Sequence, residues 1–406
     1  MGKNFVFISP TFPKNYYQFP LAWKRLGGNA LCIGEDSWDS LSAEMKSACT
    51  DYYQVGSMEN YDEMYRAVAW FAHEYGKIDW LESNNEYWLE QDAALRTDFN
   101  IVTGDKADAV MRFKTKANMK AYYKKAGVPV ARYHLTTTLE EGKKFVKEVG
   151  YPVIVKPNDG VGASATWKIT SDAELKNFYH RDLPCQYIME EFVPGNIISF
   201  DGIVDQNNKI IFKTSHTFPD PIMDIVNGKN ECWYYSEREI PKDLDEIGSK
   251  VIHAFDVRGR FFHTEYFRLY KDKPGLGKKG DIVGLEVNMR PPGGYTPDMM
   301  DFANDINVYE IYAEMAMYNE ESYSHERPYY CVYVGRRDGQ HYAKDDSIIY
   351  ENYGNDIVMH GRMPELLSDA MGNEFYIARF TEKDEMMGFV HYVYEKQVEA
   401  KKKNED

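Results

Sequence analysis

Three polar side chains occupy alternate positions in one strand-like segment, and together they could bind a metal ion and a phosphate group. They are Glu286, Asn288 and Arg290, in the run GLEVNMRPPGG. Alternate side chains of a β-strand lie on one face, so an acid, an amide and a guanidinium would share a row, and the apolar residues between them would face a core. A surface strand whose polar row meets only water would show the same pattern. A second element is therefore needed to distinguish a binding site from a solvent-exposed strand.

A second strand-like run, FFHTEYFRLY, precedes the first and is joined to it by the turn-rich segment DKPGLGKKGD. The two runs predict an antiparallel hairpin in which Glu265 faces Glu286 and Asn288. Two carboxylates held close together repel each other unless a cation lies between them. We therefore predict a site for Mg²⁺, with Mn²⁺ as an alternative, because Mg²⁺ prefers oxygen ligands and is usually shared with the phosphates of a nucleotide.

A lysine and a glycine-bearing loop follow each other further upstream. Lys156 alternates with Ile154 on the run YPVIVKP, so its ammonium group either reaches water or meets an anion. In the loop NDGVGASAT, small residues would let backbone N–H groups approach phosphates. A plain hairpin turn would explain the loop alone, but the lysine and the loop together indicate a nucleotide lid. The chain contains no G-x-x-x-x-G-K-[ST] P-loop.

The first part of the chain alternates strand-like and helix-like runs. KNFVFIS and IDWLESNN have the pattern of strands, and YDEMYRAVAWFAHEYGK has the spacing of a helix. This alternation predicts a parallel, doubly wound sheet. Ligands bind beyond the carboxyl ends of such strands, so we expect a small substrate near Asn84 and Glu86. A helix-capping turn would also explain these two residues.

Composition excludes several classes of function. The chain has 406 residues and a formal net charge of −16, which opposes nonspecific binding to nucleic acid or to an anionic membrane. Its five cysteines form no C-x-x-C pair, so neither a zinc knuckle nor a disulfide framework is indicated. The N-terminus lacks the pattern of a signal peptide and no window is long enough to span a membrane, so we expect a cytoplasmic protein.

The ordered set of these motifs strongly resembles the ATP-grasp superfamily of carboxylate-amine ligases. Its most specific segments are KANMKAYYKKAGVPVARY, YPVIVKP, MEEFVPG and GLEVNMRPPGG. The resemblance implies a mixed α/β and α+β architecture, with an N-terminal Rossmann-like (pre-ATP-grasp) domain at residues 1–111 followed by a two-lobed ATP-grasp domain. Its small lobe and lid are expected at residues 112–195, its large lobe at 196–324, and a closing subdomain with a charged tail at 325–406. In that last part, His360 and Arg362 are expected in a turn of a surface loop.

The resemblance also implies a role for each candidate residue. The ATP phosphates would be bound by Lys116 and Lys156, under a lid that includes Gly160, Gly162 and Ser164. The hinge that contacts adenine would be formed by Glu190, Glu191, Phe192 and Val193. The Mg²⁺ ligands would be Glu265, Glu286 and Asn288, and the transferring phosphoryl group would be stabilised by Arg290. The substrate would be contacted by Asn84, Glu86, Gly293 and Gly294.

One position departs from the family pattern. Many members carry a ribose-binding glutamate where this chain has Ile197, so Glu190 or Glu191 would have to supply that contact. The implied function is an ATP-dependent ligase that activates a carboxylate as an acyl phosphate for attack by an amine, with small-molecule substrates and a homodimeric assembly as further expectations. The alternatives are a purine-biosynthesis or biotin-carboxylase-like enzyme acting on a small acid or bicarbonate, and a non-catalytic ATP-binding module.

Overall fold

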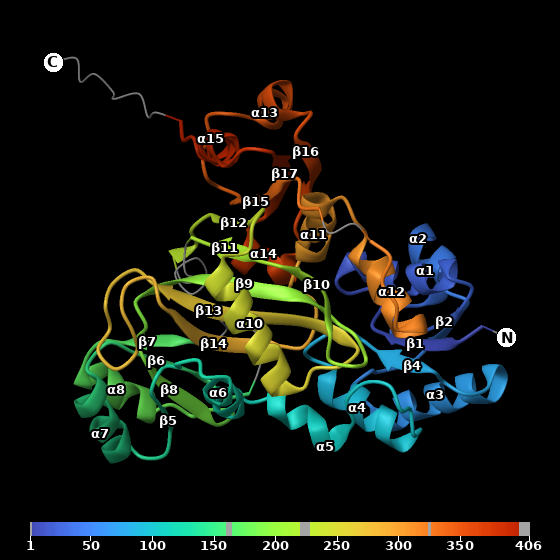
Figure 1. Ribbon diagram of the computed structural model, residues 1–406, viewed down its shortest axis with the longest axis horizontal. Coiled ribbons are helices and arrows are strands. Elements are labelled where there is room, and N and C mark those ends of the chain that lie inside the picture. The colour runs from blue at the N-terminus through green and yellow to red at the C-terminus, as the bar shows by residue number, and fades with distance from the viewer. Residues whose placement is uncertain (1, 160–164, 220–227, 324–325, 398–406) are drawn as a thin grey trace. The chain divides into compact units, whose positions relative to one another are not determined.

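The computed structural model describes residues 2–159, 165–219, 228–323 and 326–397 (Figure 1). Contacts between residues divide the chain into two compact units. The first comprises Met1–Thr214, Ile240–Pro297 and Asn307–Ser324, and the second comprises Ser215–Glu239, Asp298–Ile306 and His325–Asp406. The domain boundaries expected at residues 111, 195 and 324 stay a prediction.

The N-terminal part of the first unit is a parallel sheet with the strand order β3-β2-β1-β4, as the alternation of strands and helices predicted. Its strands are β1 (Asn4–Ile8), β2 (Asn29–Gly34), β3 (Asp51–Gln54) and β4 (Trp80–Glu82). Its helices are η1 (Lys14–Tyr17), α1 (Gln18–Arg25), η2 (Trp38–Ser40), α2 (Ala43–Ala48), α3 (Tyr61–Tyr75) and α4 (Leu89–Asp98). The carboxyl end of β4 leads directly into the predicted substrate segment, Asn84–Glu86.

An antiparallel sheet with the order β5-β8-β6-β7 follows in the chain. It is formed by β5 (Tyr133–Leu135), β6 (Val153–Pro157), β7 (Trp167–Ile169) and β8 (Tyr187–Glu191). The helices of this region are α5 (Ala107–Val110), η3 (Met111–Phe113), α6 (Lys116–Lys125), α7 (Leu139–Val149) and α8 (Asp172–Tyr179). Apolar residues of α7 and α8 pack against those of the strands, so the sheet has its own core.

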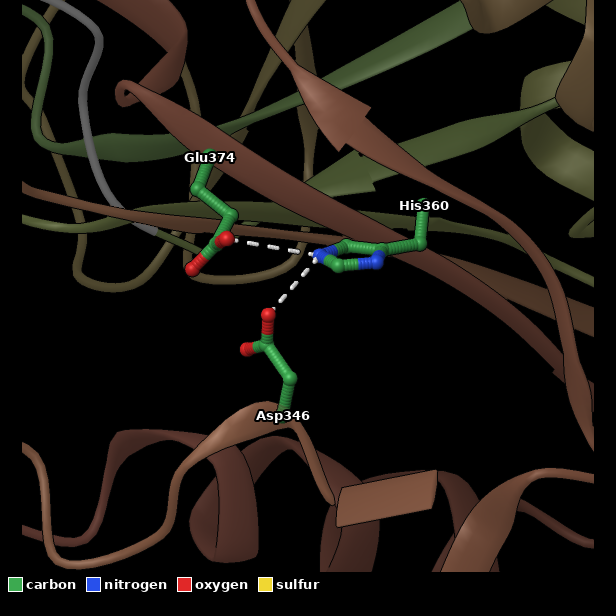
Figure 2. A group of neighbouring side chains, drawn as sticks. All are labelled: Asp346, His360 and Glu374. Carbon is green, nitrogen blue, oxygen red and sulfur yellow. Dashed lines mark hydrogen bonds and ion pairs between the residues drawn. The ribbon is translucent and has the colours of Figure 1, made fainter. Parts of the chain in front are cut away.

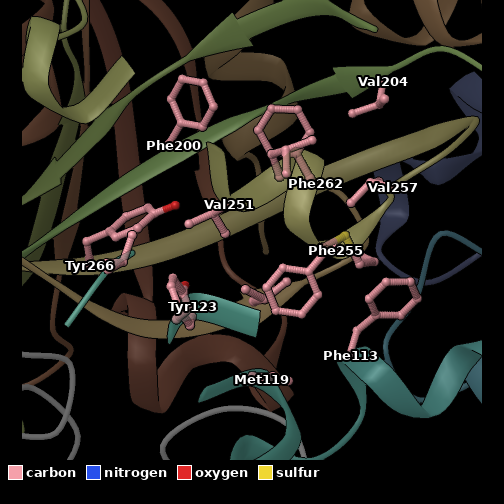
Figure 3. Close-up of a cluster of buried hydrophobic side chains, with 14 of the residues drawn as sticks. Phe113, Met119, Tyr123, Phe200, Val204, Val251, Phe255, Val257, Phe262 and Tyr266 are labelled. Carbon is pink, nitrogen blue, oxygen red and sulfur yellow. The ribbon is translucent and has the colours of Figure 1, made fainter. Parts of the chain in front are cut away.

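The predicted hairpin lies in a further antiparallel sheet of the first unit. Its strands follow one another in the order β14-β13-β9-β10, namely β14 (Ile282–Asn288), β13 (Arg260–Leu269), β9 (Gly195–Val204) and β10 (Ile210–Thr214). Helix α10 (Lys242–Phe255) and helix α6 contribute to the core beneath this sheet, where Tyr123, Phe255 and Phe262 are buried (Figure 3). Helices α11 (Thr296–Asn304) and α12 (Val308–Tyr318) come later in the chain.

The second unit contains an antiparallel sheet with the order β11-β12-β15-β17-β16. Its strands are β11 (His216–Phe218), β12 (Cys232–Ser236), β15 (Tyr330–Arg336), β16 (Ile357–Arg362) and β17 (Glu374–Phe380). Its helices include α13 (Asp346–Tyr353), α14 (Glu365–Met371) and α15 (Lys383–Tyr394). His360 and Arg362 lie in β16, so the expectation of a turn was wrong, because both residues pair with β17.

Two further features concern the whole chain. Within the described ranges, no helix combines the length and the apolar character that crossing a membrane requires. All five cysteines have free thiols, and Cys185 is the exposed one.

Candidate active site

The two carboxylates that the sequence predicted to face each other do so across the β13–β14 pair. Glu265 lies opposite Glu286, and His263 lies opposite Asn288. The side chains of Glu265 and Glu286 are 14% and 16% exposed, and Asn288 is buried. A register shift beside this pair leaves Leu285 as the extra residue of a β-bulge, an irregularity that re-aims side chains next to functional sites. The strand therefore presents acid and amide oxygens together on one face.

Arg290 does not belong to this row, and here the sequence prediction was wrong. Strand β14 ends at Asn288, and the two prolines at positions 291 and 292 have no N–H groups with which to continue a ladder. The side chain of Arg290 is held locally, where Nη1 donates to the carbonyl of Pro291 at 2.8 Å and Nε lies 3.7 Å from Oε2 of Glu86. Arg290 thus lies beyond the strand end, beside the substrate segment after β4.

A hydroxyl group on helix α6 positions the two strands that carry the carboxylate pair. The hydroxyl of Tyr123 donates to the main-chain carbonyl of Glu286 at 2.7 Å and to that of Glu265 at 3.1 Å. The close approach requires Gly284, where an added Cβ would come within 2.5 Å of the Tyr123 ring. One buried tyrosine therefore sets the spacing of both strands at the residues that carry the carboxylates.

A histidine that sequence reasoning missed supports Glu265. His263 Nδ1 lies 2.6 Å from Asp201 on β9, and Nε2 lies 3.6 Å from Glu265. Burial alone would lower the pKa of His263, but the Asp201 carboxylate outweighs it and raises the pKa to about 9. His263 in turn holds the pKa of Glu265 below its usual range against the opposing effect of burial. The available signal was the spacing of His263 two residues before Glu265, which places both on one face.

Buried lysines face carboxylates on the neighbouring elements. Lys116 Nζ lies 3.5 Å from Glu286, and Lys156 Nζ lies 2.8 Å from Glu190. Lys120, which the sequence analysis did not single out, lies 2.5 Å from the other oxygen of Glu190. Its position four residues after Lys116 on α6 puts it on the same helix face. Burial alone would raise the pKa of Glu190. The ammonium groups of Lys120 and Lys156 outweigh this effect and lower the pKa to about 2.

The start of the predicted lid is tied to helix α6. Thr115 caps this helix by accepting from the backbone of Asn118, and the backbone N–H of Lys116 donates to the carbonyl of Asn158 at 2.9 Å. Asn158 also accepts from the backbone of Ala117 through its side chain. Lys116 and the residues that lead into the glycine loop are therefore held together. The predicted lid residues Gly160, Gly162 and Ser164 lie outside the described residues.

The predicted hinge begins with the last two residues of β8, Glu190 and Glu191, and continues past the end of the strand. Glu191 forms a bidentate ion pair with Arg132, with N–O distances of 3.0 and 2.7 Å. The ammonium nitrogen of Lys168 lies 5.0 Å from the centre of the Phe192 ring. Val193 is buried, and Ile197 pairs with Phe267 inside the β9–β13 ladder. The carboxylates of Glu190 and Glu191 both bind basic side chains, so the structure does not favour either of them as a ribose contact.

The substrate segment after β4 contains buried polar groups that no cap explains. Helix α4 has Trp88 as its N-cap residue without a side-chain bond, so Asn84 and Glu86 do not cap it. Asn84 is 1% exposed and has a positive φ of 54°, and among the described residues neither atom of its side-chain amide has a hydrogen-bond partner. Burial raises the pKa of Glu86 despite Arg290 nearby. Gly294 joins the region through its carbonyl, which lies 3.5 Å from the Asn15 amide.

Comparisons with known proteins show which proteins the chain resembles in sequence and in fold. Residues 115–186 match the family described as the carbamoyl-phosphate synthase L chain, ATP binding domain. The N-terminal section of a carbamoyl phosphate synthase large chain from Methanopyrus kandleri is 26% identical over 163 residues, covering 39% of this chain and 29% of that protein. An L-arginine-specific L-amino acid ligase from Bacillus subtilis is 22% identical over 254 residues, covering 60% of this chain and 59% of that protein. Both matches span less than two thirds of the relative.

A solved structure extends the likeness to the whole chain. The L-amino acid ligase from Bacillus licheniformis superposes with a TM-score of 0.72 over 97% of this chain and 97% of its own, at 14% identity. That agreement confirms the predicted fold class, and the match of residues 115–186 is to part of an ATP-binding domain. The chain therefore has the fold of the ATP-grasp ligases, the family that its motifs resemble.

Proposed function

We propose that the protein is an ATP-dependent ligase that activates a carboxylate as an acyl phosphate and joins it to an amine, with release of ADP and phosphate. The observation that carries this proposal is the opposed pair Glu265 and Glu286, which lies beside Asn288 and within reach of the buried Lys116 ammonium. An ordinary solvent-exposed strand gives no reason for two carboxylates to lie opposite each other beside a buried lysine.

The residues fit a magnesium nucleotide. Glu265, Glu286 and Asn288 offer oxygen donors on one face of the hairpin, which is the ligand chemistry that Mg²⁺ prefers. When bound, the ion would neutralise charge that develops on the transferring phosphoryl group. Lys116 and Lys156 would bind the phosphates, and the backbone of Phe192 and Val193 would contact the adenine.

A free carboxylate is a poor acyl donor because its leaving group would be oxide, so phosphorylation must come first. Catalysis then consists largely of positioning and of stabilising negative charge. Arg290 is suited to that second role, because Glu86 and the carbonyl of Pro291 hold its guanidinium at the end of the carboxylate row. The acyl phosphate must be kept from water until the amine attacks.

The substrate would lie beside the segment after β4. The buried amide of Asn84 offers two N–H donors and one acceptor oxygen that the described residues leave without partners. A side chain added at Gly293 would meet nothing within 4 Å, so there is open space beside Gly293. Two of the similar proteins are named as L-amino acid ligases, which supports amino acids as the carboxylate and the amine.

The test is ATP turnover by the full chain with amino acids and other carboxylates, bicarbonate included, offered in pairs. Glu286→Gln should abolish substrate-dependent phosphate release and leave the circular dichroism spectrum unchanged, because the amide keeps the shape and loses the charge that holds the cation. Glu246→Gln, on the exposed face of α10, is the matched control and should behave like the wild type.

Several outcomes would contradict the proposal. Wild-type turnover in Glu286→Gln would remove the metal assignment. Release of AMP and pyrophosphate would indicate adenylation of the acid in place of phosphorylation. ATP binding without turnover for any pair of substrates would favour the non-catalytic module.

A further inference from the structure

The second unit contains a group of side chains outside the proposed active site that could hold a metal ion. One ligand atom each from Asp346, His360 and Glu374 lies within 4.8 Å of the others. His360 Nε2 is 3.4 Å from Oε1 of Glu374 and 3.9 Å from Oδ2 of Asp346. Figure 2 shows both carboxylates turned toward this one ring nitrogen.

Three separate elements bring these residues together. His360 lies on β16 and Glu374 on β17, in adjacent strands whose register pairs His360 with Tyr376. Asp346 is the first residue of α13. Because the ligands come from two strands and a helix, their convergence is a property of the tertiary structure and not of one local turn.

Neighbouring aromatic rings fix the orientation of the ligands. The imidazole of His360 stacks on the ring of Tyr376, with centroids 4.3 Å apart and planes 6° from parallel, and the ring of Tyr350 lies edge-on at 5.7 Å. The Tyr376 hydroxyl donates to Oδ1 of Asp346, while Oδ2 is the oxygen nearer His360. Such outer contacts hold ligating histidines and carboxylates in place in metal sites.

A histidine salt bridge explains the distances less well than a cation does. A single Nε2–H group would have to be shared between the two carboxylates, and both separations exceed the 2.7–3.2 Å that is normal for an N–H···O bond. Donors around a tetrahedral zinc ion lie about 3.4 Å apart, since each is about 2.1 Å from the metal. The separation of 3.4 Å from His360 to Glu374 already matches that value, and the separation of 3.9 Å from His360 to Asp346 needs only a small contraction.

We propose that Asp346, His360 and Glu374 form a binding site for a zinc-class divalent cation. Two carboxylates and a neutral imidazole match the charge of a dication, and the nitrogen donor separates this site from the all-oxygen set on β13 and β14. The side chain of Asp346 is 50% exposed, so water or a small ligand can complete the coordination. The ion would cross-link α13 to the edge strand β16 and to its neighbour β17.

The experiment uses the full chain, stripped of metal and kept in excess Mg²⁺ so that the oxygen site is filled. Co²⁺, whose visible absorption reports its coordination, is titrated into the wild type and into His360→Gln and Glu374→Gln, and Zn²⁺ is then used to displace it. The wild type should bind one Co²⁺ with a visible band that Zn²⁺ abolishes. Each variant should bind about tenfold more weakly or worse, because each loses a ligand.

His391→Gln is the matched control, since His391 is an exposed histidine on α15 of the same unit. It should bind Co²⁺ like the wild type, and circular dichroism should show that all three variants are folded. The proposal is overturned if the wild type takes up no Co²⁺, or if both ligand variants keep the wild-type affinity and absorption. ATP turnover does not enter the readout, so this result is independent of the proposed ligase activity.

Discussion

Arg290 is the residue at which the structure most sharpens the chemical prediction. It lies past the end of β14, with Nε 3.7 Å from Glu86, and so lies beside the proposed substrate segment. Arg290→Ala should lower kcat by roughly a hundredfold or more, equivalent to about 3 kcal/mol of transition-state stabilisation, with a smaller effect on KM for ATP. Steady-state phosphate release measures both constants. Arg268→Ala, which breaks an exposed pair with Asp243, should leave both unchanged, and an equal effect of the two variants would contradict the assignment.

Glu190 links the lysines of the site to the pH dependence of stability. Its pKa falls from an ordinary value near 4.5 to about 2, so the stabilisation is complete above pH 4.5 and is lost as the pH falls toward 2. Glu190→Gln should therefore cost about 3 kcal/mol of unfolding free energy at pH 7, and its difference from the wild type should shrink below pH 4.5. Urea unfolding across this range measures it. Glu148→Gln, whose carboxylate is 62% exposed, should show a small difference at every pH, and a constant difference for Glu190→Gln would refute the argument.

At the scale of elements, the position of α6 under the β13–β14 hairpin decides how the carboxylates are spaced. The Tyr123 hydroxyl binds two main-chain carbonyls there, and no other residue on the helix duplicates this contact among the described hydrogen bonds. Tyr123→Phe should cost about 1–3 kcal/mol, since buried carbonyls lose their donor, and should also reduce ATP turnover.

Thermal unfolding and phosphate release test this prediction together. Tyr122→Phe is the control, because Tyr122 is the next residue on the same helix and stacks on Phe255 through its ring. Loss of stability without loss of turnover in Tyr123→Phe would show that the hairpin keeps its spacing without this bond.

At the scale of the first unit, a buried ionic network joins the parallel sheet to the sheet that carries the carboxylates. Arg260 on β13 lies 3.0 Å from Glu82 at the end of β4 and 3.1 Å from Asp105, and its side chain is 1% exposed. Arg96 adds a contact to Glu82 at 3.4 Å. The substrate segment that follows Glu82 is thereby fixed relative to the hairpin.

Arg260→Ala should lower the free energy of unfolding by about 3–5 kcal/mol, because it leaves the buried Glu82 with less of its compensating charge. The exposed Arg258, paired with Asp256, provides the control, and Arg258→Ala should change stability by about 0.5 kcal/mol or less. Urea unfolding of the two variants measures the contrast. Similar midpoints for both would show that the network contributes little.

The sequence by itself determined the hairpin that carries the two carboxylates and the parallel sheet of the N-terminal part. Alternation in FFHTEYFRLY and GLEVNMRPPGG predicted the hairpin and the opposition of Glu265 and Glu286, because strand periodicity is local and a turn-rich connection sets the register. The alternation of strands and helices predicted the parallel sheet for the same reason.

Only the tertiary structure decided which distant side chains meet. His263 with Asp201, Lys120 with Glu190, and Arg260 with Glu82 are pairs far apart in the chain, and no local periodicity encodes them. In the structure, Arg290 lies outside the strand in which it was predicted. His360 lies close to two carboxylates from other elements. Such contacts depend on how sheets and helices pack, and packing is a property of the folded chain as a whole.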